Sequence, residues 1–359
     1  MSEGSRYRLL PGATGVAIDD RTDPHAADPL VGRLIADRYE VEEWIARGGM
    51  SRVYRARDKQ ADRLVALKVL RAPRGEPIDL YARWFSDEAT TGAALRHANT
   101  VQIFDWGQTT DGIWYLAMEY VRGNTLAHVI RTEGALAPTR AIRIASSVAS
   151  SLREAHARGI VHRDVKPANV MLVMNGDREV VKVLDFGIAG DIDEPASPEG
   201  APALGSPRYV APEQIKHVPV DGRADIYSFG IVLYEMLSGA PPFTNNRAVA
   251  VLLAHLHEMP RSIVDVSPNP IGNHLTRLVG ACLEKDPNNR PKDMDAVLRA
   301  LWESSLELGE PVLEARSGIH PAGPTIAQKG WFEQVPLWLL LGGPLLCFGF
   351  AIIWLMANA

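Results

Sequence analysis

The chain has 359 residues, of which 46% are hydrophobic, so it is long and apolar enough for one large domain or two ordinary ones with packed cores. Its formal net charge of -5 argues against a protein that binds DNA or RNA, because such proteins carry a surplus of Lys and Arg. The two cysteines, Cys282 and Cys347, belong to no Cys-X-X-Cys or Cys/His cluster, which excludes a disulfide framework or a zinc site and is typical of a reducing compartment.

The first predicted elements are strands. Residues 1–38 lack both the apolar run of a secretory signal and any helical or strand period, so we expect a flexible leader, with order beginning near Tyr39. Two runs rich in strand-forming residues, 52–58 and 64–70, flank the turn-like sequence "KQAD" at 59–62. This arrangement predicts consecutive strands of an antiparallel sheet.

One helix and two more strands follow. Residues 86–99 favour a helix, and residues 100–121 predict two strands separated by a turn rich in Gly, Thr and Asp between Gly107 and Gly112. The first part of the chain is therefore expected to be mostly sheet with one helix.

The next part is predicted to be mainly helical. Residues 169–187 predict a hairpin around Asn175-Gly176, and several helices are expected between residues 221 and 301. Residues 137–159 predict a core helix, because apolar residues recur on one face at helical spacing: Ile144, Val148, Leu152 and Ala155.

The C-terminal part contains no charged residue after position 334. About 20 apolar residues suffice to cross a bilayer as a helix, and Trp338 and Trp354 lie towards the two ends, as interfacial aromatic residues do. Residues 335–357 therefore predict a transmembrane helix, preceded by a juxtamembrane linker at 302–334. The alternative is an apolar helix docked on the domain, with a break at the Gly-Gly-Pro sequence that begins at Gly342.

The stretch "VHRDVKPANVML", residues 161–172, places polar residues between a core helix and a buried hairpin, where unpaired charge is costly. Asp164 could accept a hydroxyl proton, Lys166 could neutralise a transferring phosphoryl group, and Asn169 could hold a metal ion. Asp185, in "LDFG" directly after an apolar strand, suits Mg²⁺ beside a triphosphate. Taken alone, an Asp-Phe-Gly sequence is more often an ordinary turn.

These motifs resemble the protein kinase superfamily, specifically bacterial transmembrane serine/threonine kinases with a eukaryotic-like (Hanks-type) catalytic domain. The motifs occur in the family's order: "RGGMSRV", "VALK", "HRDVKPAN", "DFG", "APE", "ADIYSFG" and "DPNNRP". The resemblance implies an α+β fold of two lobes at 39–301, with a sheet-rich N-lobe at about 39–120 and a helical C-lobe at about 121–301.

The resemblance also implies roles for individual residues. Lys68 would contact the nucleotide phosphates and pair with Glu88, Asp164 would be the catalytic base, and Lys166 would steady the phosphoryl group. Asn169 and Asp185 would hold the metal. The implied nucleotide-binding residues are Ala46, Arg47, Gly48, Gly49, Met50, Ser51, Val53, Ala66, Lys68, Glu88, Met118, Glu119 and Val121.

The phosphate-binding loop departs from the family's pattern, because Ala46 and Ser51 stand where glycines are usual. Both are small, so backbone N–H groups could still approach phosphates, with less conformational freedom than glycine gives. We therefore expect altered nucleotide affinity rather than a lost site. In the C-lobe, the resemblance implies that Asp225 supports the catalytic loop and that Glu213 pairs with Arg290.

By the same resemblance, Lys166 indicates serine or threonine acceptors, and Ser206 stands where the family usually has Thr. Arg163 is a candidate partner for a phosphorylated activation segment. Between Phe186 and Gly205 the sole hydroxyl residue is Ser197, so either phosphorylated Ser197 orders this segment or its acidic residues substitute for a phosphate. A plain solvated acidic loop is the alternative.

The sequence thus predicts a signalling enzyme that uses ATP and Mg²⁺, phosphorylates proteins on Ser or Thr, and binds no nucleic acid. It would be a single-pass membrane protein with its kinase domain in the cytoplasm, and a kinase dimer could support autophosphorylation. The rival interpretations are a membrane-tethered pseudokinase scaffold and a small-molecule phosphotransferase of kinase-like fold.

Overall fold

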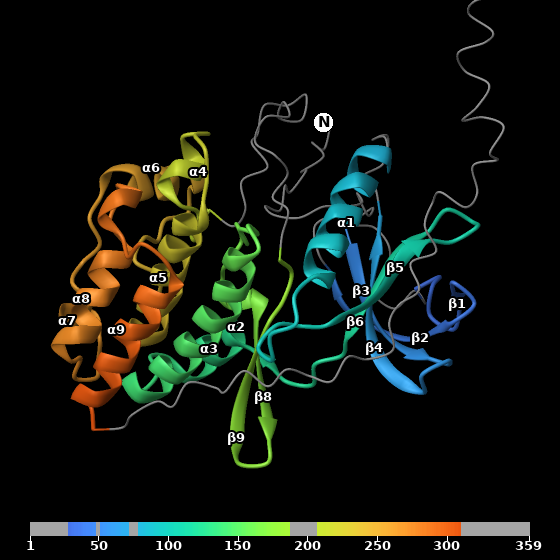
Figure 1. The fold of residues 1–359 in the computed structure, drawn as a ribbon, viewed down its shortest axis with the longest axis horizontal. Helices are drawn as coiled ribbons and strands as arrows, with labels where there is room; N and C mark the ends of the chain where they lie inside the picture. The colour runs from blue at the N-terminus through green and yellow to red at the C-terminus, as the bar shows by residue number, and fades with distance from the viewer. Residues whose placement is uncertain (1–27, 48–50, 72–77, 187–206, 310–359) are drawn as a thin grey trace, which may run out of the picture. The chain divides into compact units, whose positions relative to one another are not determined.

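The computed structural model describes residues 28–47, 51–71, 78–186 and 207–309 (Figure 1). All of them belong to the first of two compact units, residues 1–320 and 321–359. The segment predicted to span a membrane, 335–357, lies outside the described residues. Within the described ranges, no helix combines the length and the apolar character that crossing a bilayer requires.

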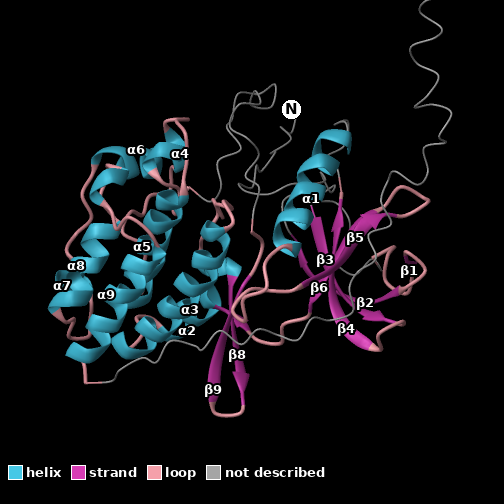
Figure 2. Cartoon of the chain, in the orientation of Figure 1, coloured by secondary structure: helices cyan, strands magenta, loops and turns pink. Residues whose placement is uncertain are grey.

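The N-terminal region is a six-stranded antiparallel sheet with strand order β1-β2-β3-β4-β6-β5 (Figure 2). The predicted strand pair is confirmed: β3 and β4 pair antiparallel around the turn at residues 59–62. The two strands expected within 100–121 are confirmed as β5 and β6. The strands are β1 Leu34–Ile35, β2 Tyr39–Arg47, β3 Ser51–Asp58, β4 Arg63–Leu70, β5 Ile103–Gln108 and β6 Trp114–Glu119.

The two faces of this sheet bury different clusters, because side chains alternate along a strand. On β4, Val65 and Leu67 belong to the cluster on one face, which we call the outer face. Ala66 belongs to the cluster on the other, inner face, which packs against helix α1 (Ile78–Ala93). Lys68 follows two residues after Ala66 on the same strand and therefore projects from the inner face.

Helix α1 begins and ends earlier than predicted, at Ile78 and Ala93 rather than over 86–99. It begins earlier because Ala82 and Phe85 extend the buried stripe towards the N-terminus. It ends earlier because the Glu154 carboxylate accepts the backbone N–H groups that follow the helix, those of Arg96 and His97, at 2.7 to 3.0 Å. These amides therefore have no need of helical partners.

Packed structure begins before Tyr39. Strand β1 pairs with β2, and Leu30 and Ile35 are buried in the outer-face cluster, although the sequence assigned residues 1–38 to a leader. The apolar residues at 30–31 and 34–35 are too few to establish a strand or helical period from the sequence.

The C-terminal region is helical with a small sheet, β7-β8-β9. The predicted core helix is confirmed as α3, and the hairpin is confirmed, with Gly176 at φ 60° in its turn. Helix α9 runs past Leu301, where the domain was expected to end. The elements are β7 Asn124–Thr125, α2 Leu126–Glu133, α3 Pro138–Ala157, β8 Val170–Asn175, β9 Arg178–Val183, α4 Pro212–Ile215, α5 Gly222–Ser238, α6 Ala248–His257, α7 Ile263–Val266, α8 Asn273–Cys282 and α9 Met294–Glu307.

Helix α5 lies at the centre of this region, since nearly all of its residues are buried. It contacts α3 and α8, while α9 packs against α3 and α8. Asp221 caps the N-terminus of α5 by accepting the N–H of Arg223, and Gly239 ends it in the left-handed conformation at φ 84°. Asp225, Tyr227 and Ser228 of α5 are buried and must find partners inside the protein.

Candidate active site

Lys68 forms the centre of an ion-pair cluster. Its Nζ lies 2.6 Å from Glu88 Oε1 and 3.3 Å from Asp185 Oδ1. The three residues come from β4, α1 and the segment after β9, so distant parts of the sequence meet at one ammonium group. The structure therefore brings together the lysine and the two carboxylates that the sequence singled out.

The electrostatics of the cluster keep Lys68 and Asp185 charged. Burial opposes the charge on Lys68, but the adjacent carboxylates of Asp185 and Glu88 raise its pKa above the ordinary value. For Asp185, burial again opposes ionisation, and the Lys68 ammonium outweighs it and lowers the pKa, with a smaller contribution from Lys166. Burial raises the pKa of Glu88, and Lys68 works against that rise.

The loop after α3 holds a second polar group. Lys166 Nζ lies 2.6 Å from Asp164 Oδ2, and Asn169 Nδ2 donates to Asp164 Oδ2 at 3.1 Å and to the Asp164 carbonyl at 3.0 Å. A single 3₁₀ turn, Pro167–Asn169, returns Asn169 to the carboxylate. Asp164 is thus oriented by a cation and an amide from its own loop.

Asp225, the first-turn carboxylate of α5, anchors this loop. It is fully buried, and it accepts the backbone N–H of His162 and of Arg163, each at 2.8 Å. The His156 Nε2 lies 2.7 Å from Asp225 Oδ2. These contacts match the supporting role predicted for Asp225.

The backbone is strained at two of the predicted residues. Arg163 has φ 63° and Asp185 has φ 43°, in the left-handed region that residues with a Cβ avoid. Such strain persists only where surrounding contacts impose it, and it gathers at functional sites. Here the two amide bonds to Asp225 hold the first position, and the ion pair with Lys68 holds the second.

The two polar groups are joined by the residues between them. His162 lies 3.1 Å through Nε2 from the Leu184 carbonyl, while its Nδ1 accepts the Asp164 N–H at 3.4 Å. Its ring packs on Phe186, with centroids 4.7 Å apart. The loop after α3 and the segment that carries Asp185 are therefore linked by one histidine.

The inner face of the sheet lies next to this cluster. Val53 is paired with Lys68 across β3 and β4, and Ala66 is paired with Met118 across β4 and β6. Ala66 and Met118 are both buried. These predicted nucleotide contacts thus share one apolar face beside Lys68.

The segment after β6 is held by an ion pair. Glu119, at the end of that strand, accepts from Lys182 Nζ at 2.8 Å, and its backbone N–H donates to the Gln102 carbonyl. Val121 follows and packs, partly buried, against the inner-face cluster. The side chain of Glu119 is therefore used by Lys182 and its backbone N–H by Gln102, so neither of these groups is free for a nucleotide base.

A small cavity adjoins the ion-pair cluster and is lined in part by Gly92, Ile103, Met118 and Phe186. Gly92 lies one helical turn after Glu88, and a Cβ at Gly92 would lie 2.6 Å from Ile103 Cδ1. The Ile103 side chain therefore occupies the space that a larger residue at position 92 would take.

Part of the predicted site falls outside the described residues. This holds for Gly48, Gly49 and Met50 of the phosphate-binding loop and for Ser197 and Ser206 of the activation segment. On either side of the loop, Ala46 and Arg47 end β2, and Ser51 begins β3 and is buried. The Ala46 backbone pairs with Val53 next to an irregularity of the β2–β3 ladder.

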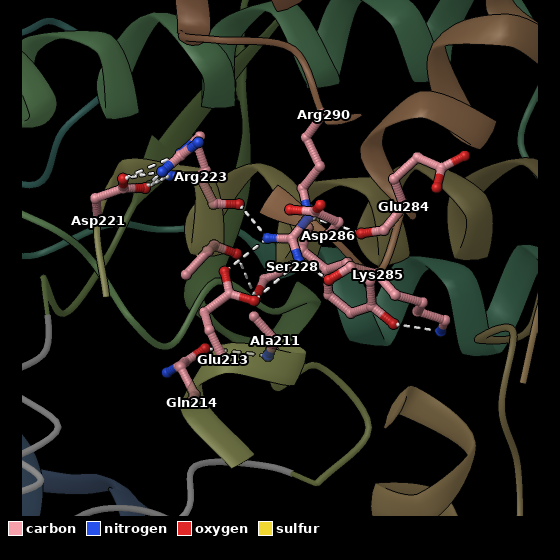
Figure 3. Close-up of polar contacts among 12 residues, drawn as sticks. Ala211, Glu213, Gln214, Asp221, Arg223, Ser228, Glu284, Lys285, Asp286 and Arg290 are labelled. Carbon is pink, nitrogen blue, oxygen red and sulfur yellow. Dashed lines mark hydrogen bonds and ion pairs between the residues drawn. The ribbon is translucent and has the colours of Figure 1, made fainter. Parts of the chain in front are cut away.

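The predicted Glu213–Arg290 pair is present (Figure 3). Arg290 donates to both Glu213 carboxylate oxygens, at 2.6 and 2.9 Å, and to the backbone carbonyls of Arg223, Glu284 and Lys285. These bonds occupy all the N–H groups of the guanidinium. The pair thus fixes α4 to the rest of the C-terminal region.

The donors expected to bind a metal fit Mg²⁺, which prefers oxygen ligands. Asn169 uses its Nδ2 for Asp164, so its amide oxygen is the atom it can offer to a cation. Asp185, whose side chain is 38% exposed, offers an ionised carboxylate. Within the described ranges, no group of three or more His, Cys, Asp or Glu side chains gathers as a metal centre would.

Several supporting residues were missed from the sequence. His156 and Gln214 carried no local signal, yet His156 binds Asp225 and Gln214 Nε2 donates to the Arg163 carbonyl at 3.1 Å. Lys182 looked like one of many polar residues on a hairpin. Asp225 was expected from the family resemblance, but its contacts with His156 and with the backbone N–H groups of His162 and Arg163 could not be read from spacing.

The region that matches known proteins has nearly the same bounds as the kinase domain predicted at 39–301. The profile described as "Protein kinase domain" matches residues 39–302. The chain is 38% identical over 301 residues to the serine/threonine-protein kinase PknB of Mycolicibacterium smegmatis, covering 81% of this chain and 45% of that protein. It is 39% identical over 278 residues to the serine/threonine-protein kinase pkn3 of Myxococcus xanthus, covering 75% of this chain and 50% of that protein.

Among solved structures, the crystal structure of the Mycobacterium tuberculosis PknI kinase domain superposes with a TM-score of 0.60 at 28% identity. The match covers 76% of this chain and 98% of that one. The chain spans half or less of the length of the two curated relatives named above.

Proposed function

The chain belongs to the protein kinase family, and on that premise we propose that it is a serine/threonine protein kinase, which transfers the γ-phosphoryl group of ATP to hydroxyl groups of proteins. Curated relatives named as serine/threonine kinases support the acceptor class. The proposal covers the catalytic domain at residues 39–301 and its substrates, because those relatives are much longer than the matched region.

One observation carries the proposal: the Lys68–Glu88–Asp185 cluster lies beside a loop in which Lys166 and Asn169 orient Asp164. Lys68 would neutralise nucleotide phosphates. A scaffold without catalysis would not need all of these polar groups in mutually oriented positions, which disfavours the pseudokinase alternative.

The chemistry follows from these positions. Asp164 would orient an acceptor hydroxyl and take its proton, while Lys166, 2.6 Å away, would balance the charge that develops on the transferred group. Asn169 and Asp185 would hold Mg²⁺, which when bound supplies charge neutralisation at the phosphates. The protein's contribution is mainly positioning and fixed charge, with little covalent chemistry.

Replacing the base tests the activity. We expect Asp164→Asn to lower the rate of phosphate transfer from labelled ATP to a generic protein acceptor by about 10²- to 10⁴-fold. Asp177→Asn, the same exchange in the exposed hairpin turn, is the matched control and should leave the rate unchanged. Equal activity of the Asp164 variant and wild type would refute the assignment, and nucleotide binding without turnover by wild type would favour the pseudokinase.

Regulation belongs to the same proposal. Arg163 would bind a phosphate on the activation segment, with Ser197 as the modified residue. Mass spectrometry of autophosphorylated protein checks this, and an unmodified Ser197 with unchanged kinetics of Ser197→Ala would contradict it. Mixing active protein with the Asp164→Asn variant would show whether phosphorylation occurs between two copies.

We also propose that residues 335–357 anchor the protein in a membrane, after a linker at 302–334, with the kinase domain in the cytoplasm. The uncharged, apolar character of this segment supports the proposal. Fractionation of cells expressing the full chain and a chain ending at residue 334 tests it. Recovery of both forms in the soluble fraction would contradict the anchor.

A further inference from the structure

Asp28 lies before the region that matches the kinase family, yet it contacts the strand that leads out of the phosphate-binding loop. Its side chain is only 8% exposed and forms an ion pair with the Arg52 guanidinium on β3. It also accepts the Tyr54 hydroxyl at 3.1 and 3.2 Å and the Leu30 N–H at 3.0 Å. A buried carboxylate with this many donors is a specific contact.

The segment carrying Asp28 is itself fixed to the sheet. Leu30 and Ile35 are buried in the outer-face cluster. The Gly32 N–H donates to the Val41 carbonyl at 2.8 Å, and the Val41 N–H donates to the Arg33 carbonyl at 2.9 Å. Asp28 is therefore held by the backbone that follows it and can act as a fixed point for β3.

The contact lies at the base of the phosphate-binding loop. Arg52 is paired with Arg47, and this is the final β2–β3 pair before residues 48–50. Since side chains alternate, Arg52 and Tyr54 project from the outer face, while Val53 between them packs with the inner-face cluster beside Lys68. Fixing the outer side of β3 thus fixes the position of Val53 and of the loop's end.

Loss of Asp28 would leave its partners without a counter-charge. The Arg52 side chain is 13% exposed, and its guanidinium lies 5.5 Å from the Trp44 ring centroid, so it has little access to water. A buried cation without its partner either moves towards solvent or pulls its strand with it. Either change displaces the strand end next to the loop.

We propose that Asp28 is a positioning residue for nucleotide binding, which acts through Arg52 and Tyr54 to hold β3 at the base of the phosphate-binding loop. This inference rests on the proposed ATP-dependent function. It assigns a role in that function to residues 28–38, which lie outside the family match at 39–302.

The test uses the full chain and measures steady-state kinetics at varied ATP. We expect Asp28→Ala to raise the KM for ATP about fivefold to tenfold with little change in kcat, because the phosphates lose a positioned loop rather than a catalytic group. Arg52→Ala should have a similar effect, and the double variant should be no worse than either single variant. Asp28→Glu should recover part of the affinity.

Arg33→Ala is the matched control, because it removes another ion pair of the same segment, Arg33–Asp111, which is exposed and joins the segment to the turn between β5 and β6 rather than to β3. Its KM for ATP should equal that of wild type. Equal KM increases in the Arg33 and Asp28 variants would overturn the inference, since they would indicate general loosening of the segment. If Asp28→Ala does not fold, the KM values for ATP of Asp28→Asn and Tyr54→Phe are compared with that of Arg33→Ala instead. Both variants should raise the KM, because each removes a contact between Asp28 and β3.

Calorimetric titration with ADP separates the two proposals. If wild type binds ADP and Asp28→Ala binds it with the same affinity, the positioning role of Asp28 is refuted while the proposed function stands. If wild type binds no ADP and transfers no phosphate, the proposed function fails and the role of Asp28 fails with it.

Discussion

The Glu213–Arg290 pair and the Lys68–Glu88–Asp185 cluster both join distant parts of the sequence through ion pairs. We call the first closed, because all its N–H donors have partners inside the protein, and the second open, because one of its carboxylates is exposed. Arg290 has no exposed side-chain surface, and its N–H groups are all used by Glu213 and by backbone carbonyls. In the cluster, the Asp185 side chain is 38% exposed, with oxygen atoms available to another cation.

The difference separates structural from functional ion pairs. In the closed Glu213–Arg290 pair, no charged group of Arg290 is accessible to solvent or to a ligand. The pair therefore serves only to fix α4 against the end of α8 and the start of α5. An open cluster keeps charge available at some cost in stability, which is the arrangement that binding of a charged substrate requires. Substitutions should therefore affect stability in the first and activity in the second.

The closed pair should give the largest effect. We expect Arg290→Ala to lower the free energy of unfolding by about 3–5 kcal/mol, because it leaves the Glu213 carboxylate buried without a partner. Chemical denaturation measures this change. Arg290→Lys should recover part of the loss, since it restores the charge but not the bidentate geometry. A stable Arg290→Ala protein with reduced activity would reverse the comparison.

The open cluster should give the next largest effect, on rate. Lys68→Met should lower kcat about 10²- to 10³-fold, because it removes fixed positive charge from the transition state. Its loss of stability should be smaller than that of Arg290→Ala, since Glu88 and Asp185 can reach solvent or take up a proton. Thermal unfolding and single-turnover kinetics on the same samples measure the two effects. A loss of stability as large as that of Arg290→Ala would contradict the distinction between the closed pair and the open cluster.

Lowering the pH should destabilise the protein near the Glu213–Arg290 pair, because His255 becomes protonated. This histidine is fully buried, its Nδ1 lies 3.0 Å from the Tyr227 hydroxyl, and the Tyr227 ring lies 4.8 Å from the Arg290 guanidinium. Burial, with the positive charge of Lys285, lowers the pKa of His255 from 6.5 to about 4. The unfolded chain therefore binds a proton more readily, so this contribution to stability is complete above pH 6.5 and is lost as the pH falls towards 4.

The loss should amount to about 2–3 kcal/mol between those pH values. Urea unfolding at a series of pH values measures it. In His255→Gln, which keeps an acceptor for Tyr227 but does not titrate, the slope over this range should shrink, and an unchanged slope would assign the acid sensitivity to other groups.

The smallest effect is expected at an exposed pair. Arg33 and Asp111 form an ion pair at 2.7 Å with side chains 46% and 52% exposed. Arg33→Ala should leave the midpoint of urea unfolding close to that of wild type, because solvent screens the pair. A clear fall in that midpoint would show that the edge of the sheet depends on this contact.

Much of the site was predictable because the relevant residues stand in short motifs. The motifs alone indicate Lys68, Asp164, Lys166, Asn169 and Asp185. Their arrangement was not predictable from the residues alone, since the 117 positions that separate Lys68 from Asp185 carry no local sign of a 3.3 Å contact. The start of α1 was misplaced because the predicted helix began at Ser86, although Ala82 and Phe85 continue the helical spacing of Ala89 towards the N-terminus.

The sequence by itself determined what short-range physics controls. The runs of strand-forming residues in β3 and β4, the helical stripe of α3 and the Asn175-Gly176 turn each depend on neighbours a few positions apart.

Only the tertiary structure decided which backbone groups and distant side chains complete the contacts of each buried charge. Packing brings distant parts of the chain together in three places. It places Asp225 next to the backbone N–H groups of His162 and Arg163, surrounds Arg290 with carbonyls, and brings Asp28 into contact with β3. A buried polar group must be satisfied wherever the fold places it, and its partner is therefore set by the fold as a whole.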